Sequence, residues 1–160
     1  MNETASKAGA AAAPQTAPNL WSLTVTCMLA WLVPGLGHFL LKRPRRAVAF
    51  TLCICFLFLW GLVLGAKIYQ FDSQQPLTLF AMIAQGGMGA VYFTVRAVTS
   101  YAQAHTGSIF YGFAQSFDFG NGAIEKLTFE YGNTFAIVAG LLNFLVVLDA
   151  YDIATGKKKG

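Results

Sequence analysis

Charged side chains are scarce in this sequence of 160 residues: eleven Lys or Arg and seven Asp or Glu make up 11% of it. A soluble globular domain carries roughly 25%. Hydrophobic residues reach 56% and the mean hydropathy is +0.53. Eighteen charges cannot cover the surface of a soluble domain of this size. The composition excludes a disordered chain, a disulfide scaffold and a coiled coil, and it predicts an integral membrane protein.

The sequence also lacks the residues that common catalytic and metal sites require. Cys27, Cys53 and Cys55 lie in apolar runs, where cysteine acts as a small hydrophobe. The two histidines, His38 and His105, are far apart, and no Cys/His pair completes four metal ligands. No nucleophile elbow, phosphate loop, dinucleotide fingerprint or zinc-protease motif occurs. We therefore expect no metal, no cofactor and no enzymatic activity.

The positive charge is concentrated beside apolar segments. The formal net charge is +4, and seven of the eleven cations are Lys42, Arg43, Arg45, Arg46 and the three lysines at 157–159. Basic clusters in such places contact anionic lipid headgroups. A nucleic-acid partner would require a folded polar surface, so we expect none. The predicted partner of the 42–46 cluster is the lipid bilayer, with an acidic protein as the alternative.

Four long apolar segments predict an all-α polytopic membrane protein with about four transmembrane helices. They cover residues 20–41, 47–66, 77–95 and 134–151, within a single transmembrane domain over 20–156. Proline removes a helical hydrogen bond, so the first helix is predicted to break between Pro34 and Gly37. Residues 1–19 are expected to be a disordered tail and 157–160 a basic tail. Residues 97–133 contain eight aromatics and predict an interfacial loop between the third and fourth helices.

The distribution of cations leaves two topologies open. Four crossings place both termini and the 67–76 loop on one side, with five cations there and six on the other. If residues 20–41 instead enter the membrane and return, the tally becomes seven to four. We favour a cytoplasmic 42–46 cluster in both cases. Four crossings also predict that Asp149 lies nearer Lys67 than Arg96, and that His38 lies at the opposite face from Asp149.

Small residues at helical spacing predict close contacts between helices, because they let two backbones approach. Such positions recur in three of the expected helices. They are Gly61, Gly65, Gly86, Gly89, Ala90, Ala136 and Gly140.

One short motif resembles a known family. The turn of the two-transmembrane-helix domain family joins two helices, and Pro34 through Phe39, together with Arg43, match its Pro/Gly-Leu-Gly-(His)-Phe-Tyr-Leu-Gly-Arg pattern. Leu40 stands where Tyr is usual and Lys42 where Gly is usual. The resemblance covers residues 25–66. The chain end, 141–154, is similar to the end of small uncharacterised bacterial membrane proteins that carry this turn, a family of unknown function. The resemblance implies architecture and no chemistry.

Four polar residues are candidates for a structural or interaction role. His38 follows the helix break and is expected to bond a carbonyl that Pro34 leaves unpaired, with headgroup chemistry as the alternative. Asn143 is expected to hydrogen-bond across to another helix. Asp149 and Asp152 share one helix face near the end of the last span, where an interfacial anchor or ion pair is favoured over a proton relay.

These observations favour a small non-enzymatic protein of the bacterial inner membrane, a structural or assembly component that packs with itself or with a larger complex. A transporter or channel subunit is the first alternative, although the spans offer few polar groups beyond Asn143 and Gln85. A lipid-modifying enzyme that uses His38, Asp149 and Asp152 is the second.

Overall fold

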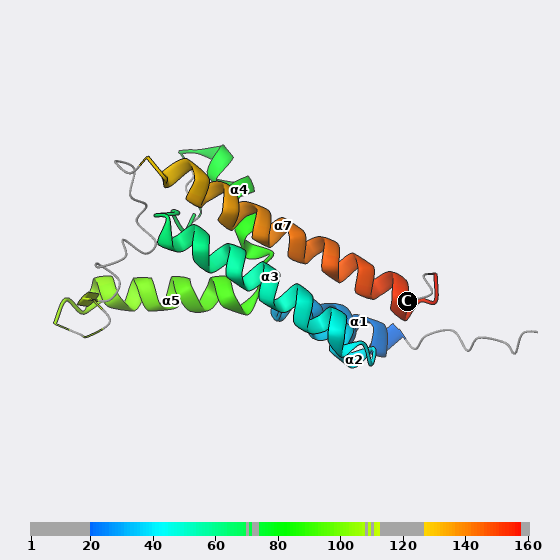
Figure 1. Cartoon of the computed structure of the whole chain (residues 1–160). Coiled ribbons are helices and arrows are strands. Elements are labelled where there is room, and N and C mark those ends of the chain that lie inside the picture. The colour runs from blue at the N-terminus through cyan, green and yellow to red at the C-terminus, as the bar shows by residue number, and fades with distance from the viewer. Residues whose placement is uncertain are drawn as a thin grey trace, which may run out of the picture.

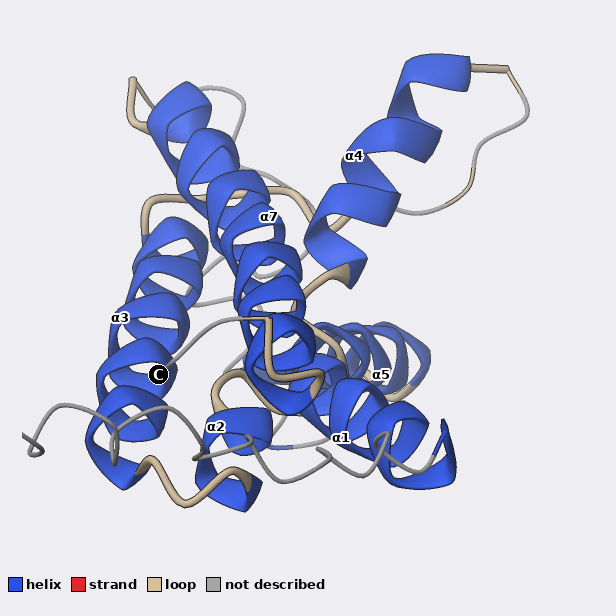
Figure 2. Ribbon diagram, turned by 90° about the vertical axis from the view of Figure 1, so that its right-hand side faces the viewer, coloured by secondary structure: helices blue, strands red, loops and turns tan. Residues whose placement is uncertain are grey.

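The protein is all-helical (Figures 1 and 2). The computed structural model describes residues 20–69, 71, 74–107, 109, 111–112 and 127–157, and no β-strand occurs within these ranges. Tail residues 1–19 and 158–160 lie outside them, and so do residues 108, 110 and 113–126 of the expected aromatic loop. The helices are α1 (Leu20–Leu32), α2 (Leu36–Leu40), α3 (Pro44–Val63), α4 (Pro76–Gly86), α5 (Ala90–Ala104) and α7 (Phe129–Ala154).

Helices α3 and α7 form an antiparallel pair that runs the length of the molecule (Figure 1). With 20 and 26 residues, both are long and apolar enough to cross a membrane. Their backbones meet at glycines: a Cβ added to Gly61 would lie 2.8 Å from the carbonyl oxygen of Gly132 and 3.0 Å from the nitrogen of Ala136. The absence of side chains at this crossing is what lets the two helices pack so closely.

Residues 20–41 form a short hairpin instead of one long helix. Helix α1 ends at Leu32, and Gly35 takes a left-handed φ of 84° that turns the chain back into α2. Gly37 of α2 packs against Ala30 of α1. A Cβ added to Gly37 would lie only 2.6 Å from the Ala30 Cβ, so this close contact requires glycine. The break predicted at Pro34 is therefore present, and the segment divides into helices of 13 and five residues.

The expected third span, 77–95, is also broken. Helix α4 ends at Gly86, Gly89 has a φ of 56°, and α5 starts at Ala90 with its axis bent by 119° from that of α4. A bend above 90° turns α5 back toward the end of the molecule where α4 began (Figure 1). Helix α5 continues to Ala104, so it includes residues that were expected in the interfacial loop.

Only two of the described helices thus have the length and composition of a membrane span, or three if the bent pair forms one broken span. The shorter apolar helix α1 falls below that length. This differs from the four spans expected from the sequence, since two of the four apolar segments turn back on themselves. The glycines at positions 35 and 89 are responsible, because left-handed backbone is readily adopted by glycine alone.

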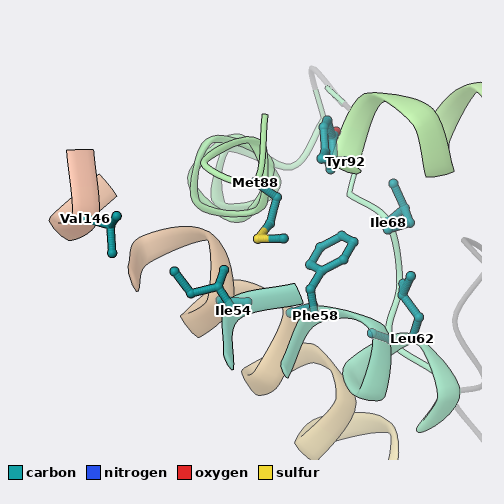
Figure 3. Close-up of a cluster of buried hydrophobic side chains, with 10 residues drawn as sticks. Ile54, Phe58, Leu62, Ile68, Met88, Tyr92 and Val146 are labelled. Atoms are coloured by element: carbon teal, nitrogen blue, oxygen red, sulfur yellow. The ribbon is translucent and has the colours of Figure 1, made fainter. Parts of the chain in front are cut away.

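The core lies where α3, α7 and the α4–α5 bend meet (Figure 3). Ile54, Phe58 and Leu62 repeat at four-residue spacing and line one face of α3. Met88 from the bend and Tyr92 from α5 pack against them. The core therefore fixes the bend against the long helix pair.

Candidate functional site

A buried pair joins α2 to the end of α7. The Nε2 atom of His38 lies 2.9 Å from Oδ2 of Asp149, and the His38 side chain is fully buried whereas that of Asp149 is 20% exposed. The Phe50 ring meets the imidazole edge-on at 5.0 Å between ring centres. The remaining ring nitrogen, Nδ1, is buried and has no hydrogen-bond partner in the described part of the chain.

This pair corrects two expectations. The carbonyl oxygen of Pro34 accepts a hydrogen bond from Thr51 Oγ1 at 2.6 Å, so His38 is not the group that satisfies it. Four full crossings would put His38 and Asp149 at opposite membrane faces, whereas they are in contact. They can meet because α1 and α2 form a hairpin that starts and ends at one end of the α3–α7 pair.

The basic cluster surrounds this same end. Lys42, Arg45 and Arg46 are exposed and Arg43 is half-buried in the turn between α2 and α3. Lys157, beyond α7, lies over the Tyr151 ring, 5.7 Å from its centre. We call this the basic end, and the opposite end, where α3 stops and α7 starts, the loop end.

A second polar site lies at the middle of α7. Asn143 is fully buried, and its Nδ2 donates to the carbonyl oxygen of Trp31 at 3.1 Å and to that of Gly87 at 2.7 Å. Trp31 Nε1 donates in turn to the carbonyl oxygen of Gly86 at 3.2 Å. Gly89 is in contact with the Trp31 carbonyl oxygen. We call these residues the central junction.

The central junction joins two helix ends that arrive from opposite directions. Helix α1 starts at the basic end and α4 on the side of the loop end, and both stop beside Asn143 (Figure 1). The last carbonyls of a helix have no partner within the helix, and they carry a partial negative charge. The Asn143 amide supplies the donor that the Trp31 and Gly87 carbonyls lack. The Trp31 indole adds a second donor to the Gly86 carbonyl, which also accepts from the Gly89 amide.

A third group of hydrogen bonds holds the segment after α3 at the loop end. Gln85 is fully buried, accepts a hydrogen bond from the Tyr69 amide at 3.0 Å and donates to the Lys67 carbonyl at 2.9 Å. The Asn133 side chain accepts from the Lys67 amide at 2.9 Å. Tyr92 donates to the Tyr69 carbonyl at 2.7 Å. Burial raises the pKa of the Tyr69 hydroxyl, and the Glu130 carboxylate raises this pKa further.

The small residues singled out from the sequence have different roles. Gly61 and Ala136 form the α3–α7 contact, and Gly140 is in contact with the Ala84 carbonyl oxygen of α4. Gly65 is buried and has a φ of 94°, and it ends α3 in a Schellman motif, with Ala66 N bonded to the Gly61 oxygen.

Three other small residues lie at the bend and not in a helix groove. Gly89 forms the N-cap of α5 and Ala90 is its first residue. Gly86 is different from its neighbours, since a Cβ added there would meet no atom within 4 Å.

Several functional positions were not identified as sites from the sequence. Trp31, Thr51 and Gly87 matter because of the two breaks. Nothing in the sequence pairs Thr51 with Pro34, 17 positions away, or Asn143 with Trp31 and Gly87, 112 and 56 positions away. Gln85 had one usable signal, a polar side chain in a span, and was read as a possible transport group. Asp152 shares a face with Asp149 but forms no ion pair with another described residue.

Comparison with known proteins gives one match. The model of a family of unknown function, DUF6677, matches residues 25–159, which is most of the chain. The chain belongs to DUF6677. No curated protein and no solved structure matches it. The DUF6677 match includes both the His38 turn and the Asp149 end of α7, so the two segments in contact lie in one family domain.

Most side-chain hydrogen bonds at these sites are made to backbone atoms. Among the described residues, no group of three His, Cys, Asp or Glu side chains is placed to hold a metal ion. The buried amides of Asn143 and Gln85 donate to backbone carbonyls. The His38–Asp149 pair is the one arrangement in the described chain that resembles an oriented acid–base pair.

Proposed function

We propose that this DUF6677 protein is a non-enzymatic structural or assembly component of the bacterial inner membrane, one that packs with itself or with a larger membrane complex. The observation that supports it is the central junction. The buried amide of Asn143 and the indole of Trp31 hold the ends of α1 and α4. Groups used in this way make the middle of the molecule rigid.

The same observation weakens the transport alternative. A transport path needs polar groups that face a ligand, and the sequence offered Asn143 and Gln85 for that purpose. Both are fully buried and bonded to backbone atoms, and of their side-chain polar atoms Asn143 Oδ1 alone has no partner among the described residues. Breaking those bonds to bind a passing solute would leave carbonyls without partners in an apolar environment, at a cost of several kcal/mol each.

In the arrangement we propose, α3 and α7 cross the bilayer, and the α1–α2 and α4–α5 hairpins enter it from opposite faces. Irregular backbone in the hydrocarbon region must be covered by protein or water. The described chain leaves the first break partly uncovered: an apolar pocket of about 310 Å³ opens beside Pro34 and Gly35, lined also by Val48 and Leu52 of α3. A second copy or a partner helix in this pocket would cover the break.

The basic end is proposed to face the cytoplasm. Five of the described cations lie there (Lys42, Arg43, Arg45, Arg46 and Lys157), whereas Lys67 is at the loop end and Arg96 is within α5. Positive residues near the ends of membrane spans are retained on the cytoplasmic side. The hairpin arrangement therefore gives a stronger charge asymmetry than four crossings.

The assembly proposal is tested by the oligomeric state in a native-like bilayer. The full chain is extracted from membranes in polymer-bounded nanodiscs and weighed by native mass spectrometry. We expect a discrete oligomer or a defined complex, lost in Val48→Trp, which fills the Pro34 pocket, and retained in Leu141→Trp on the exposed face of α7. A monomer alone in every preparation would contradict the proposal.

A second candidate function, a lipid-modifying enzyme, is favoured by the His38–Asp149 contact. Four crossings would separate His38 from Asp149, two of the groups expected for this candidate, whereas the two side chains lie 2.9 Å apart. An imidazole oriented by a carboxylate is a common general base. The test compares total lipid profiles of cells that express the wild type and Asp149→Asn at equal protein levels. A lipid species that changes in the wild type alone supports catalysis, and identical profiles contradict it.

A further inference from the structure

The α4–α5 bend encloses a pocket that the proposed assembly role does not use. It has a volume of about 360 Å³, within the range of roughly 300–1,000 Å³ typical of ligand pockets. Met82 and Gly86 of α4, Phe93 and Arg96 of α5, Trp31 and Phe144 line it. The side chain of Phe93, which lines the pocket, is 49% exposed, so the pocket is open at the lateral surface of the molecule. In the proposed arrangement acyl chains surround this surface.

One wall of this apolar pocket is cationic. Arg96 is half-buried, and within the described residues no carboxylate lies at ion-pair distance from it. Its guanidinium hydrogen-bonds to the Tyr92 hydroxyl, a neutral partner that itself donates to the Tyr69 carbonyl. An arginine within an apolar segment is costly unless it reaches an anion or the headgroup region, so its presence indicates a function.

The floor of the pocket is kept open by Gly86. The other glycine of α4's end, Gly87, has no room for a Cβ because the Gly140 carbonyl occupies that space, whereas a Cβ on Gly86 would meet nothing within 4 Å. Packing within the chain therefore does not explain Gly86. A flexible chain from outside the protein could occupy the volume that a larger residue would fill.

We propose that this pocket binds one anionic membrane lipid, with an acyl chain between Gly86 and Phe93 and its phosphate on Arg96. The position of Arg96 supports a lipid over a soluble anion. It is seven residues from Gly89, about 10 Å along α5 from the central junction, and its side chain can extend to the headgroups at the loop end. The apolar volume lies between it and the junction.

The probe is Trp31, because its indole lines the pocket. Trp21→Phe and Trp60→Phe leave it as the single tryptophan of the full chain. Nanodiscs contain brominated phosphatidylglycerol or brominated phosphatidylcholine at equal mole fraction, and bromine quenches indole fluorescence on contact. We expect the anionic lipid to occupy the pocket about fivefold more readily, the factor that corresponds to about 1 kcal/mol per cation.

Three variants make the result decisive. Arg96→Gln abolishes the lipid preference and Arg96→Lys retains it. Gly86→Leu fills the pocket and reduces the quenching of Trp31 by both lipids. A matched protein with Trp60 as its only tryptophan, on the exposed face of α3, is quenched equally by the two lipids. Helix content measured by circular dichroism shows that each variant is folded.

Equal quenching of Trp31 by the two lipids would overturn the proposal, and so would a preference unchanged in Arg96→Gln or quenching unchanged in Gly86→Leu. None of these three outcomes bears on the oligomeric state, so the lipid site and the assembly role fail independently.

Discussion

Asn143 donates a hydrogen bond to the carbonyl oxygen of Trp31 across 3.1 Å, although the two residues are 112 positions apart. The same amide nitrogen reaches Gly87 at 2.7 Å. One side chain thus ties α1 to the α4–α5 bend at the middle of the longest helix. The fold depends on this contact because each of the two broken segments leaves carbonyls that the helices themselves cannot satisfy.

Replacing the Asn143 amide tests how much it contributes to the stability of the protein. Asn143→Leu keeps a similar volume and leaves the Trp31 and Gly87 carbonyls without a donor, so we expect the free energy of unfolding to fall by about 1–3 kcal/mol. The measurement is reversible unfolding of the purified chain in mixed micelles with increasing denaturing detergent. Leu148→Ala, on the exposed face of the same helix, is the control and should change stability by less than about 0.5 kcal/mol. A similar fall in the free energy of unfolding in both variants would show that the central junction stabilises the protein no more than an exposed position does.

The pairing of His38 with Asp149 predicts coupling between the two residues. A double-mutant cycle of His38→Ala and Asp149→Asn should give an interaction energy of about 0.5–3 kcal/mol in the same unfolding assay. The control cycle uses Asp152→Asn, which removes a carboxylate one turn away that forms no ion pair with another described residue. Its effect should be additive with that of His38→Ala within about 0.5 kcal/mol. Additivity in both cycles would contradict the contact.

Lys42 has a backbone conformation that suits glycine. Its φ is 58°, in the left-handed region, and it stands where the two-transmembrane-helix domain turn usually has Gly. Left-handed backbone costs a residue with a side chain roughly 1–2 kcal/mol, so Lys42→Gly should stabilise the protein by about 1 kcal/mol. Arg46→Gly removes the same charge from within α3 and should destabilise it by about 1 kcal/mol. Thermal unfolding of the two variants at equal salt compares them, and shifts of the same sign would refute the explanation.

Gly140, at the α4–α7 contact, and Gly86, beside open space at the end of α4, should respond oppositely to replacement by alanine. Gly140→Ala places a methyl group against the Ala84 carbonyl oxygen, which separates the helices and costs about 1–3 kcal/mol. Gly86→Ala points into open space and favours the helix by up to about 1 kcal/mol. Differential scanning calorimetry of the two variants should show transition temperatures below and above the wild type, and a lower temperature for both would show that the Gly86 space is smaller than described.

The sequence predicted the local features of the fold and missed those that depend on distant contacts. The break at Pro34 and the spans over α3 and α7 follow from proline, glycine and hydrocarbon length, which act within one segment. The bend at Gly89 was read as a packing groove, because glycine serves both purposes and only the left-handed φ distinguishes them. Hairpins that meet at Asn143 cannot be inferred from a hydropathy pattern, which measures the length of a segment and not its direction.

The candidate site shows the same limit. His38, Asn143 and Asp149 were identified as polar residues in apolar surroundings, and all three form specific contacts. Their partners were not identified, because the partners depend on which helix ends lie at the same height along the α3–α7 pair. The four-crossing topology placed His38 and Asp149 at opposite faces, whereas their contact fits the alternative that was left open, in which residues 20–41 enter and return.

The central claim is that α1–α2 and α4–α5 enter from opposite faces and turn back. Its most direct test is labelling of single cysteines with a membrane-impermeant maleimide in sealed, oriented vesicles, after replacement of Cys27, Cys53 and Cys55 by alanine. Cysteines at positions 20 and 42 should react from one face, and cysteines at 74 and 105 from the other. Labelling of 20 and 42 from opposite faces, with 74 on the same face as 20, would be the result of four crossings and would contradict the account.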